Sequence, residues 1–214
     1  MKVVKLNVDD VSWSDASKYI NCISDRRRKR VLRFKREDDK LLSVMSELLV
    51  RNKAAESLNI PQNEIEFGCN DFGKPFLVDF PDYHFSISHS ADCVAFIESS
   101  KPVGVDIERF SERRLRIAKR FFTENEFDFI NSSKEPDWDF FRIWTSKEAY
   151  VKMLGVGLSK PLKSFDVLSD ELKRDFRSEK VSDYMLTVCC ENAAADEIEI
   201  EEISGSSLIE NFDI

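Results

Sequence analysis

Alternating apolar and polar residues predict several β-strands in this chain of 214 residues. The alternation is clear over 2–8, 85–90 and 103–110, and a period of two is what a strand with one buried face requires. An apolar run predicts a further strand over 93–97, and we expect it to lie in one sheet with 85–90 and 103–110. Weaker patterns predict strands at about 164–168, 183–190 and 197–203.

Apolar residues at three- and four-residue intervals predict two long helices. The first pattern runs from 24 to 58, and the second runs from 137 to 154, with Gly155 suited to the position after its last turn. Shorter helices are expected over 14–22, over 114–122 and from Thr123, which forms a capping box with Glu126. Helices and strands mixed in this way predict an α+β fold.

A faint internal repeat links the two long helices. The sequence SELLVR at 46–51 parallels SKEAYVK at 146–152, and a short apolar segment follows each stretch. The repeat suggests two similar halves that meet near residue 102. We therefore expect an N-terminal half at 1–102 and a C-terminal half at 103–214.

The composition predicts a soluble, globular protein with a sizeable core. The chain is 42% hydrophobic and 34% charged, and it contains no apolar run long enough to cross a bilayer. Its first residues are too interrupted for a signal peptide, so we expect a cytoplasmic protein with no membrane partner. Five cysteines without C-x-x-C spacing indicate neither a disulfide framework nor a thiolate zinc site.

Charge is distributed unevenly along the chain. The net charge of −8 argues against a general nucleic-acid binder, yet eight of the eleven residues at 26–36 are basic. This basic segment, residues 26–36, has three interpretations: a solvated helix face, a site for RNA or another polyanion, and a clamp for a terminal phosphate. Arg27 and Arg30 share one helix face, which suits a compact phosphate better than a long polyanion.

The strand expected at 103–110 carries the first candidate chemistry. Its aliphatic residues alternate with Asp106 and Glu108, so both carboxylates fall on the face opposite the core. Two converging carboxylates raise each other's proton affinity unless a cation lies between them, and Mg²⁺ prefers such oxygen ligands. The alternative is a half-exposed strand whose acids pair with nearby lysine or arginine. Gly104 favours the first interpretation, because glycine inside a strand often marks the close approach of a ligand or another backbone.

The second long helix offers a third carboxylate. Glu148 and Lys152 are spaced i,i+4, and such a pair is worth about 0.2–0.5 kcal/mol if it only stabilises the helix. In the alternative, Glu148 completes a metal site or acts as a base while Lys152 faces a phosphate, which requires the helix to pack beside Asp106. His89 is likewise open to two interpretations, a core residue or a donor to an anion.

Together these segments resemble the larger, pseudodimeric, Sfp-type 4′-phosphopantetheinyl transferases, which activate nonribosomal peptide and polyketide synthases. The resemblance covers nearly the whole chain and rests on GVDIE at 104–108 and WTSKEAYVK at 144–152, supported by GKP at 73–75, FSISHS at 85–90 and RFF at 120–122. It implies two α/β halves related by a pseudo-twofold axis. Each half would have a small, mostly antiparallel sheet and a long helix, with the active site at their interface.

By that resemblance the protein would transfer the 4′-phosphopantetheine of coenzyme A to a serine of an apo acyl or peptidyl carrier protein and release adenosine 3′,5′-bisphosphate. Mg²⁺, with Mn²⁺ as the alternative, would be held by Asp106, Glu108 and Glu148 against the pyrophosphate. Glu148, or a water on the metal, would take the serine proton. Lys152 would help to neutralise the phosphates, so Glu148, Lys152 and Asp106 are the predicted catalytic residues.

The same resemblance assigns the coenzyme A contacts. Three residues would bind the 3′-phosphate and three would frame the nucleotide: Arg27, Arg30 and His89, and Lys74, Pro75 and Ser88. Where family members commonly carry a further arginine for the 3′-phosphate, this chain has Leu42.

The segment at 113–125 resembles the region on which the carrier docks. Four basic residues there would steer an acidic carrier to it: Arg113, Arg114, Arg116 and Lys119. Since one chain contains both halves of the site, we expect a monomer and no nucleic-acid partner. The competing hypothesis is a non-catalytic protein that binds RNA or another polyanion through the basic segment.

Overall fold

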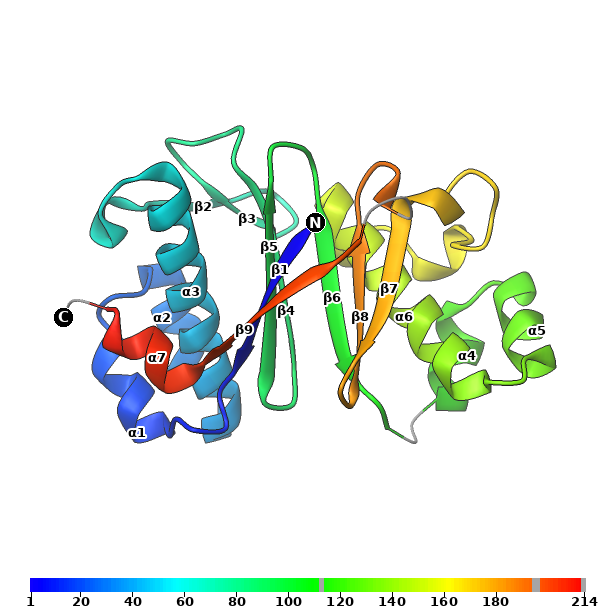
Figure 1. Cartoon of the computed structure of the whole chain (residues 1–214), viewed down its shortest axis with the longest axis horizontal. Coiled ribbons are helices and arrows are strands. Elements are labelled where there is room, and N and C mark those ends of the chain that lie inside the picture. Colours follow the sequence, from blue (N-terminus) through cyan, green and yellow to red (C-terminus); the bar gives the residue numbers. More distant parts are fainter. Residues whose placement is uncertain (112–113, 194–196, 213–214) are drawn as a thin grey trace.

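The computed structural model describes residues 1–111, 114–193 and 197–212, apart from the side chains of 114–116 and 158. Two halves lie side by side, each made of a sheet with helices on its outer side (Figure 1). The α+β fold expected from the sequence is confirmed, with small sheets, long helices and an arrangement in two halves.

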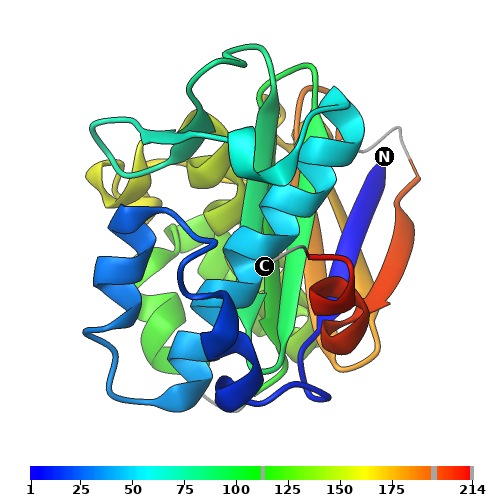
Figure 2. The ribbon, with the colours of Figure 1, turned by 90° about the vertical axis from the view of Figure 1, so that its left-hand side faces the viewer.

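The first half is built on a four-stranded sheet. Its strands, in spatial order, are β4 (His84–Ser90), β5 (Cys93–Ser99), β1 (Lys2–Asn7) and β9 (Glu199–Ser204). All neighbours are antiparallel except β1 and β9, which run parallel. Around this sheet lie a hairpin and four helices: β2 (Phe67–Cys69), β3 (Pro75–Leu77), α1 (Trp13–Ala16), α2 (Asp25–Val31), α3 (Glu37–Leu58) and α7 (Gly205–Glu210). Figure 2 shows α3 lying over the strands, where its apolar side forms a core with Val94 and Phe96.

The second half is built on an antiparallel three-stranded sheet. Its strands, in spatial order, are β6 (Gly104–Arg109), β8 (Tyr184–Cys189) and β7 (Phe176–Val181). Three helices accompany it: α4 (Arg114–Phe121), α5 (Glu124–Ser132) and α6 (Pro136–Leu154). Helix α6 packs on β6 and β8, and its aromatic residues Phe140 and Phe141 form a core with Phe122. As expected, Gly155 ends α6 with a φ of 68°, and the capping box of Thr123 and Glu126 begins α5.

A third apolar cluster joins the two halves. Val3, Ala95 and Ile97 from the first sheet pack there with Val105 and Val188 from the second. Each sheet is therefore covered on both faces, by a long helix on the outside and by the other half on the inside. This packing explains why β5, β6 and β8 are almost entirely buried.

Strands β4 and β6 meet through serine side chains, so the expectation that β6 joins the sheet of β4 and β5 is wrong. The backbone of β6 pairs with β8. On its other side, Ser86 Oγ accepts a hydrogen bond from Val105 N at 2.9 Å, and Ser90 Oγ accepts one from Arg109 N at 3.1 Å. These hydroxyls accept from backbone amides that a strand ladder would otherwise bind, and the amide of Val105 is buried.

The long helical pattern at 24–58 forms two helices, α2 and α3, separated by residues 32–36. The charges explain the break, since basic side chains occupy the last turn of α2 and acidic ones the first turn of α3: Arg28, Lys29 and Arg30, and Glu37, Asp38 and Asp39. Each sign suits the helix dipole at its own end. The spacing of apolar residues alone does not predict the break between α2 and α3.

The strand expected at 164–168 is absent from the structure. Residues 162–164 form a 3₁₀ turn instead. The carbonyls of Leu162 and Phe165 both accept hydrogen bonds from Lys147 Nζ at 2.7 Å, a convergence on one ammonium that a straight strand does not allow. Strand β7 and helix α7, by contrast, were not expected from the sequence.

The end of the chain returns to the first half. Strand β9 pairs with β1 from Lys2 opposite Glu199 onwards, and α7 contacts α3. The division at residue 102 stays a prediction, because residues 199–210 pack with the half that precedes it. Across the described residues, every helix is too short or too polar to span a bilayer.

Candidate active site between the two halves

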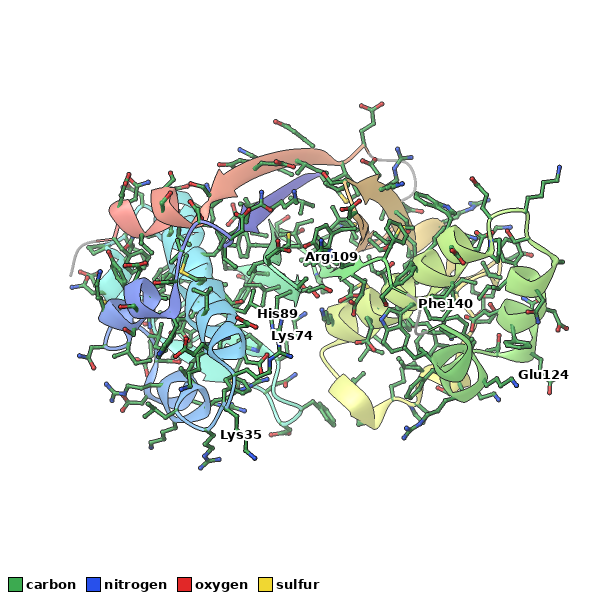
Figure 3. All side chains as sticks on the ribbon, turned by 90° about the horizontal axis from the view of Figure 1, so that it is seen from below. Lys35, Lys74, His89, Arg109, Glu124 and Phe140 are labelled. Atoms are coloured by element: carbon green, nitrogen blue, oxygen red, sulfur yellow. The ribbon has the colours of Figure 1, made fainter. Side chains whose placement is uncertain are left out.

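A cavity of about 560 Å³ lies between the two halves. Its wall contains residues from α2, the turn after β2, β4, β6 and α6. All ten residues singled out from the sequence line it: Arg27, Arg30, Lys74, Pro75, Ser88, His89, Asp106, Glu108, Glu148 and Lys152. Figure 3 labels two of them, Lys74 and His89, and shows both in the middle of the molecule. The predicted residues are therefore brought together, although their individual roles stay predictions.

Asp106 forms the floor of the cavity on β6 and is 3% exposed. Its Oδ1 accepts hydrogen bonds from Ser88 Oγ and from Lys152 Nζ, both at 2.7 Å. Its Oδ2 is buried and has no hydrogen-bond partner among the described residues. A buried carboxylate oxygen without a partner is costly, so this oxygen favours a cation or a donor from a ligand.

Glu108 lies two residues further along the same face. Its Oε2 accepts a hydrogen bond from Ser90 Oγ at 2.9 Å, and its Oε1 accepts one from Trp144 Nε1 at 3.3 Å. Burial and the negative charge of Asp106 raise the pKa of Glu108, while these two donors oppose that rise. The carboxylate is thus fixed in position and sensitive to any added positive charge.

Glu148 reaches the cavity from α6 because that helix lies in backbone contact with β6. A Cβ atom on Gly104 would lie 1.9 Å from Ala149 O, so only glycine permits this approach. The structure confirms that another backbone comes close at this glycine. Burial, followed by the charge of Asp106, raises the pKa of Glu148 to about 7. At neutral pH this group can hold or release a proton.

Lys152 does not form the helix pair that its spacing to Glu148 allows. Its Nζ lies 2.7 Å from Asp106 Oδ1 on the neighbouring strand β6. The lysine therefore links the helix to the strand and places a positive charge among the three carboxylates. This arrangement disfavours the interpretation of Glu148 and Lys152 as a surface pair that only stabilises α6.

The chemistry of these residues fits a cation, although they are not gathered into a ready metal site. In the part of the chain that the structure describes, no three His, Cys, Asp or Glu side chains are placed closely enough to hold a metal ion. Three facts nevertheless favour a positive charge here: the buried Oδ2 of Asp106, the raised pKa of Glu108 and the raised pKa of Glu148. Mg²⁺ suits such a set, since it is commonly held by few protein carboxylates together with phosphate and water.

The opposite wall of the cavity is basic. Arg27 is held by Glu47, whose Oε2 lies 3.0 Å from Arg27 Nε, while Arg30 is exposed at the mouth. Desolvation by the surrounding protein lowers the pKa of His89, and the charges of Lys152 and Arg27 lower it further. A neutral imidazole beside several cations favours a ligand that is itself anionic.

The turn at 70–74 joins the two halves at the edge of the cavity. Lys74 Nζ donates hydrogen bonds to Val103 O and Met153 O, both at 3.3 Å, and burial lowers its pKa to about 8. Asn70 Nδ2 donates to Gly155 O at 2.7 Å. The side chain of Lys74 thus bridges the start of β6 and the end of α6, so its predicted role beside a nucleotide would add to a structural one.

Two family models match the chain. The 4′-phosphopantetheinyl transferase superfamily matches residues 102–196, and the N-terminal part of 4′-phosphopantetheinyl transferase matches residues 11–101. The 4′-phosphopantetheinyl transferase Sfp of Bacillus subtilis is 35% identical over 170 residues, which is 78% of this chain and 76% of that protein. This chain belongs to the 4′-phosphopantetheinyl transferase superfamily.

Other transferases of this superfamily show the same likeness. The 4′-phosphopantetheinyl transferase gsp of Aneurinibacillus migulanus is 42% identical over 145 residues, which is 67% of this chain and 60% of that protein. The human L-aminoadipate-semialdehyde dehydrogenase-phosphopantetheinyl transferase is 32% identical over 164 residues, which is 69% of this chain and 53% of that protein. The comparisons support an enzyme of this class, and they do not support a protein that only binds RNA.

The transferase motif at 144–152 contains a lysine, Lys147, that forms a buried ion pair which sequence reasoning missed. Lys147 and Glu126 are both 0% exposed, and Lys147 Nζ lies 2.8 Å from Glu126 Oε2. Glu126 also accepts hydrogen bonds from Thr123 N at 2.8 Å and Val167 N at 2.9 Å. The pair links α5, α6 and the loop at 162–167, and Lys147 is the residue that precedes Glu148 on α6. No sequence signal indicated the pair, since Glu126 was noted only in a capping box and Lys147 only as part of the motif.

Sequence reasoning also missed the side chains that hold Glu108. Ser90 and Trp144 were noted only as parts of motifs, yet both donate to its carboxylate. The predicted docking segment at 113–125 is only partly described. Residue 113 lies outside the described residues, and so do the side chains of Arg114 and Arg116.

Proposed function

We propose that this phosphopantetheinyl transferase moves the 4′-phosphopantetheine group of coenzyme A to a serine hydroxyl of an apo acyl or peptidyl carrier protein. The observation that carries the proposal is the single cavity in which three carboxylates of β6 and α6 face the basic residues of α2 and β4. Coenzyme A has a pyrophosphate and a separate 3′-phosphate, so its charges match a site with a cation at one end and arginines at the other.

Glu148 is the proposed general base. Its pKa of about 7 allows it to accept the proton of the serine hydroxyl near neutral pH. The serine oxygen then forms a bond to the phosphorus next to pantetheine, and the bond from that phosphorus to the bridging oxygen breaks. Adenosine 3′,5′-bisphosphate leaves with the bridging oxygen, so the atoms and charges of the step balance.

Lys152 and Asp106 are the other proposed catalytic residues. The ammonium of Lys152 lies in the cavity within 2.7 Å of Asp106 Oδ1, which holds it beside the reacting phosphates. A fixed positive charge there stabilises the negative charge that builds on the leaving oxygen. Asp106 orients this lysine with one oxygen, and its other oxygen is buried without a partner among the described residues.

Asp106, Glu108 and Glu148 are the residues that would hold Mg²⁺, or Mn²⁺ in its place. The metal, when bound, supplies positive charge to the pyrophosphate. The protein's own contribution is to hold the carboxylates, through Ser88 on Asp106 and through Ser90 and Trp144 on Glu108.

The basic wall is the proposed site of the adenosine part of coenzyme A. Arg27, Arg30 and His89 would bind the 3′-phosphate, while Lys74 and Pro75 would lie against the nucleotide. Ser88 was assigned to the nucleotide as well, but its hydroxyl donates to Asp106 Oδ1 and the residue is 6% exposed. We therefore assign Ser88 to holding the carboxylate. Docking of the carrier at 113–125, action as a monomer and a cytoplasmic location complete the proposal.

The test is a transfer assay followed by mass spectrometry of intact proteins. The purified enzyme is mixed with coenzyme A, Mg²⁺ and an apo carrier, and the carrier should gain the mass of one phosphopantetheine. A carrier with its acceptor serine changed to alanine, and an assay with EDTA in place of Mg²⁺, are the matched controls. Absence of transfer to every carrier in a panel, while a known transferase modifies the same carriers, would contradict the proposal.

A further inference from the structure

A single buried carboxylate organises the basic wall of the cavity. Glu47 lies on α3 and is 2% exposed. Its Oε1 accepts a hydrogen bond from Ser24 N at 2.5 Å and lies 3.2 Å from an arginine nitrogen of Arg51. Its Oε2 accepts one from Ser24 Oγ at 2.8 Å and lies 3.0 Å from Arg27 Nε. Glu47 lies in the repeat segment at 46–51, and none of the roles assigned above belongs to it.

These contacts fix both the arginine and the helix that carries it. Ser24 is the N-cap of α2, so its two hydrogen bonds to Glu47 set the position of the first turn of that helix. Arg27 is bound on its Nε side by Glu47, and its NH1 donates to Ser43 O at 3.3 Å. Arg27 nevertheless lines the cavity, as does Arg30 one turn later. The direction in which Arg27 faces the cavity thus depends on Glu47.

Orientation, rather than the amount of charge, is what Glu47 contributes. One carboxylate between the guanidinium groups of Arg27 and Arg51 cancels part of the positive charge that an anion in the cavity would meet. If charge alone decided binding, removal of Glu47 would strengthen the binding of an anion. A guanidinium held on one edge, however, loses less rotamer freedom when its other edge binds phosphate, and it keeps a planar geometry for two parallel hydrogen bonds.

We infer that Glu47 is a positioning residue that confers selectivity for the 3′-phosphate of coenzyme A by holding Arg27 and the first turn of α2. The inference rests on the proposed function, in which Arg27 contacts that phosphate. Glu47 touches no substrate. It acts through Arg27, in the same way that buried carboxylates orient the ligands of other anion and metal sites.

The experiment compares coenzyme A with 3′-dephospho-coenzyme A as substrates of the wild type and of Glu47→Gln. Glutamine keeps the shape of the side chain and removes its charge. We expect the KM for coenzyme A to rise about tenfold, as for the loss of a hydrogen bond to a charged group, while the KM for the dephospho substrate and both kcat values change less than about twofold. A KM for coenzyme A that falls, or equal changes with both substrates, would overturn the inference.

Arg51→Lys is the matched control variant. Arg51 binds Glu47 at Oε1, not at the Oε2 that faces Arg27, and it donates its remaining hydrogen bonds to Gln62 O and Ile65 O, away from the cavity. This variant disturbs the buried cluster without removing the contact between Glu47 and Arg27. It should therefore lower the melting temperature and leave the ratio of the two KM values unchanged. A shift of that ratio as large as in Glu47→Gln would indicate a structural role only, and would also overturn the inference.

Direct binding gives a readout that does not depend on catalysis. Titration calorimetry with adenosine 3′,5′-bisphosphate and with adenosine 5′-monophosphate isolates the 3′-phosphate, and Glu47→Gln should weaken binding of the first nucleotide alone. Arg27→Ala separates the two possible failures. If the wild type and Arg27→Ala show equal preference for the 3′-phosphate, the proposed phosphate site is wrong. If Arg27→Ala loses the preference and Glu47→Gln keeps it, only the role of Glu47 is wrong.

Discussion

The two long helices carry acid and base at the same spacing and use them in opposite ways. In α3 the pair is Glu47 and Arg51, which lie 3.2 Å apart with exposed side-chain fractions of 2% and 9%. In α6 the pair is Glu148 and Lys152, and the lysine bonds to Asp106 at 2.7 Å instead of to its helix neighbour. We call the first pair closed, because its two members bond to each other and are buried. We call the second pair open, because its members do not bond to each other and both line the cavity.

The strand beside each helix accounts for this difference. Gly104 lets β6 approach the backbone of α6, which brings Asp106 within reach of Lys152. Burial, followed by the negative charge of Asp106, then raises the pKa of Glu148 to about 7. In α3 the carboxylate of Glu47 is surrounded by donors from α2, so its charge is compensated inside the protein. The first half thus contributes basic residues to the wall of the cavity, and the second half contributes carboxylates, of which Glu148 has a raised pKa.

The largest expected effect separates the two glutamates by activity. Glu148→Gln should lower kcat by about 10²–10⁴-fold, the range typical of the loss of a general base. Glu47→Gln should leave kcat nearly unchanged, because that residue acts on binding alone. Initial rates of carrier modification at saturating coenzyme A measure both. Equal losses of kcat in the two variants would erase the proposed functional difference between the helices.

The two basic partners should differ in their effect on stability. Arg51→Met leaves Glu47 buried with fewer donors, and removal of one partner from a buried pair typically costs about 3–5 kcal/mol. Lys152→Met should cost less, about 1 kcal/mol, since the Lys152 side chain is 28% exposed and Asp106 keeps its hydrogen bond from Ser88. Urea unfolding of both variants gives the free energies of unfolding. A larger loss for Lys152→Met would show that its pair, too, serves mainly to stabilise the fold.

The close approach of β6 to α6 can be tested by adding one methyl group. In Gly104→Ala the new Cβ would lie 1.9 Å from Ala149 O, a backbone atom that cannot move without shifting α6, so we expect a loss of about 3 kcal/mol. Gly68→Ala in β2 is the control. Its Cβ would lie 2.4 Å from the ring of Phe76, an exposed side chain that can turn away. Unfolding in urea should therefore show a loss below about 1 kcal/mol for the control, and similar losses would contradict this account of Gly104.

Periodicity predicted the elements that carry the site, and the resemblance predicted its residues. Alternation placed Asp106 and Glu108 on one face of a strand, and the helical pattern placed Glu148 and Lys152 one turn apart. Both of these placements follow from patterns among residues that are close in sequence. The pairing of β6 with β8 does not, because its partner lies about eighty residues further along and alternation does not specify which strand is adjacent.

Buried charge was the other feature that local patterns did not predict. Lys147 and Glu126 are charged residues that a pattern assigns to the surface, yet both are fully buried. Their burial depends on each other and on the carbonyls of Leu162 and Phe165, so it requires three separate segments, α5, α6 and the loop at 162–165, to come together. Glu47 was missed for the same reason, since its partners Ser24 and Arg27 lie on a different helix.

The smallest expected effect is a difference in the pH dependence of stability. The pKa of Glu148 is raised from 4.5 to about 7, so the folded protein binds this proton more tightly than the unfolded chain does. The stability of the free wild type should therefore fall as pH rises from about 4.5 to about 7. Glu148→Gln lacks this loss and should be about 2 kcal/mol more stable than the wild type at pH 8, with the difference vanishing near pH 4.5.

Removal of the carboxylate in α3 should change the stability at pH 8 in the opposite direction. Glu47→Gln removes a carboxylate that is fully bonded, so this variant should be less stable than the wild type at pH 8. Urea unfolding without metal or coenzyme A, at pH 5 and pH 8, compares the three proteins. If Glu148→Gln is also destabilised at pH 8, then Glu148 is already compensated in the free enzyme. The proposed difference between α3, whose glutamate is fully paired, and α6, whose glutamate is half-buried with its charge not fully compensated, would then be wrong.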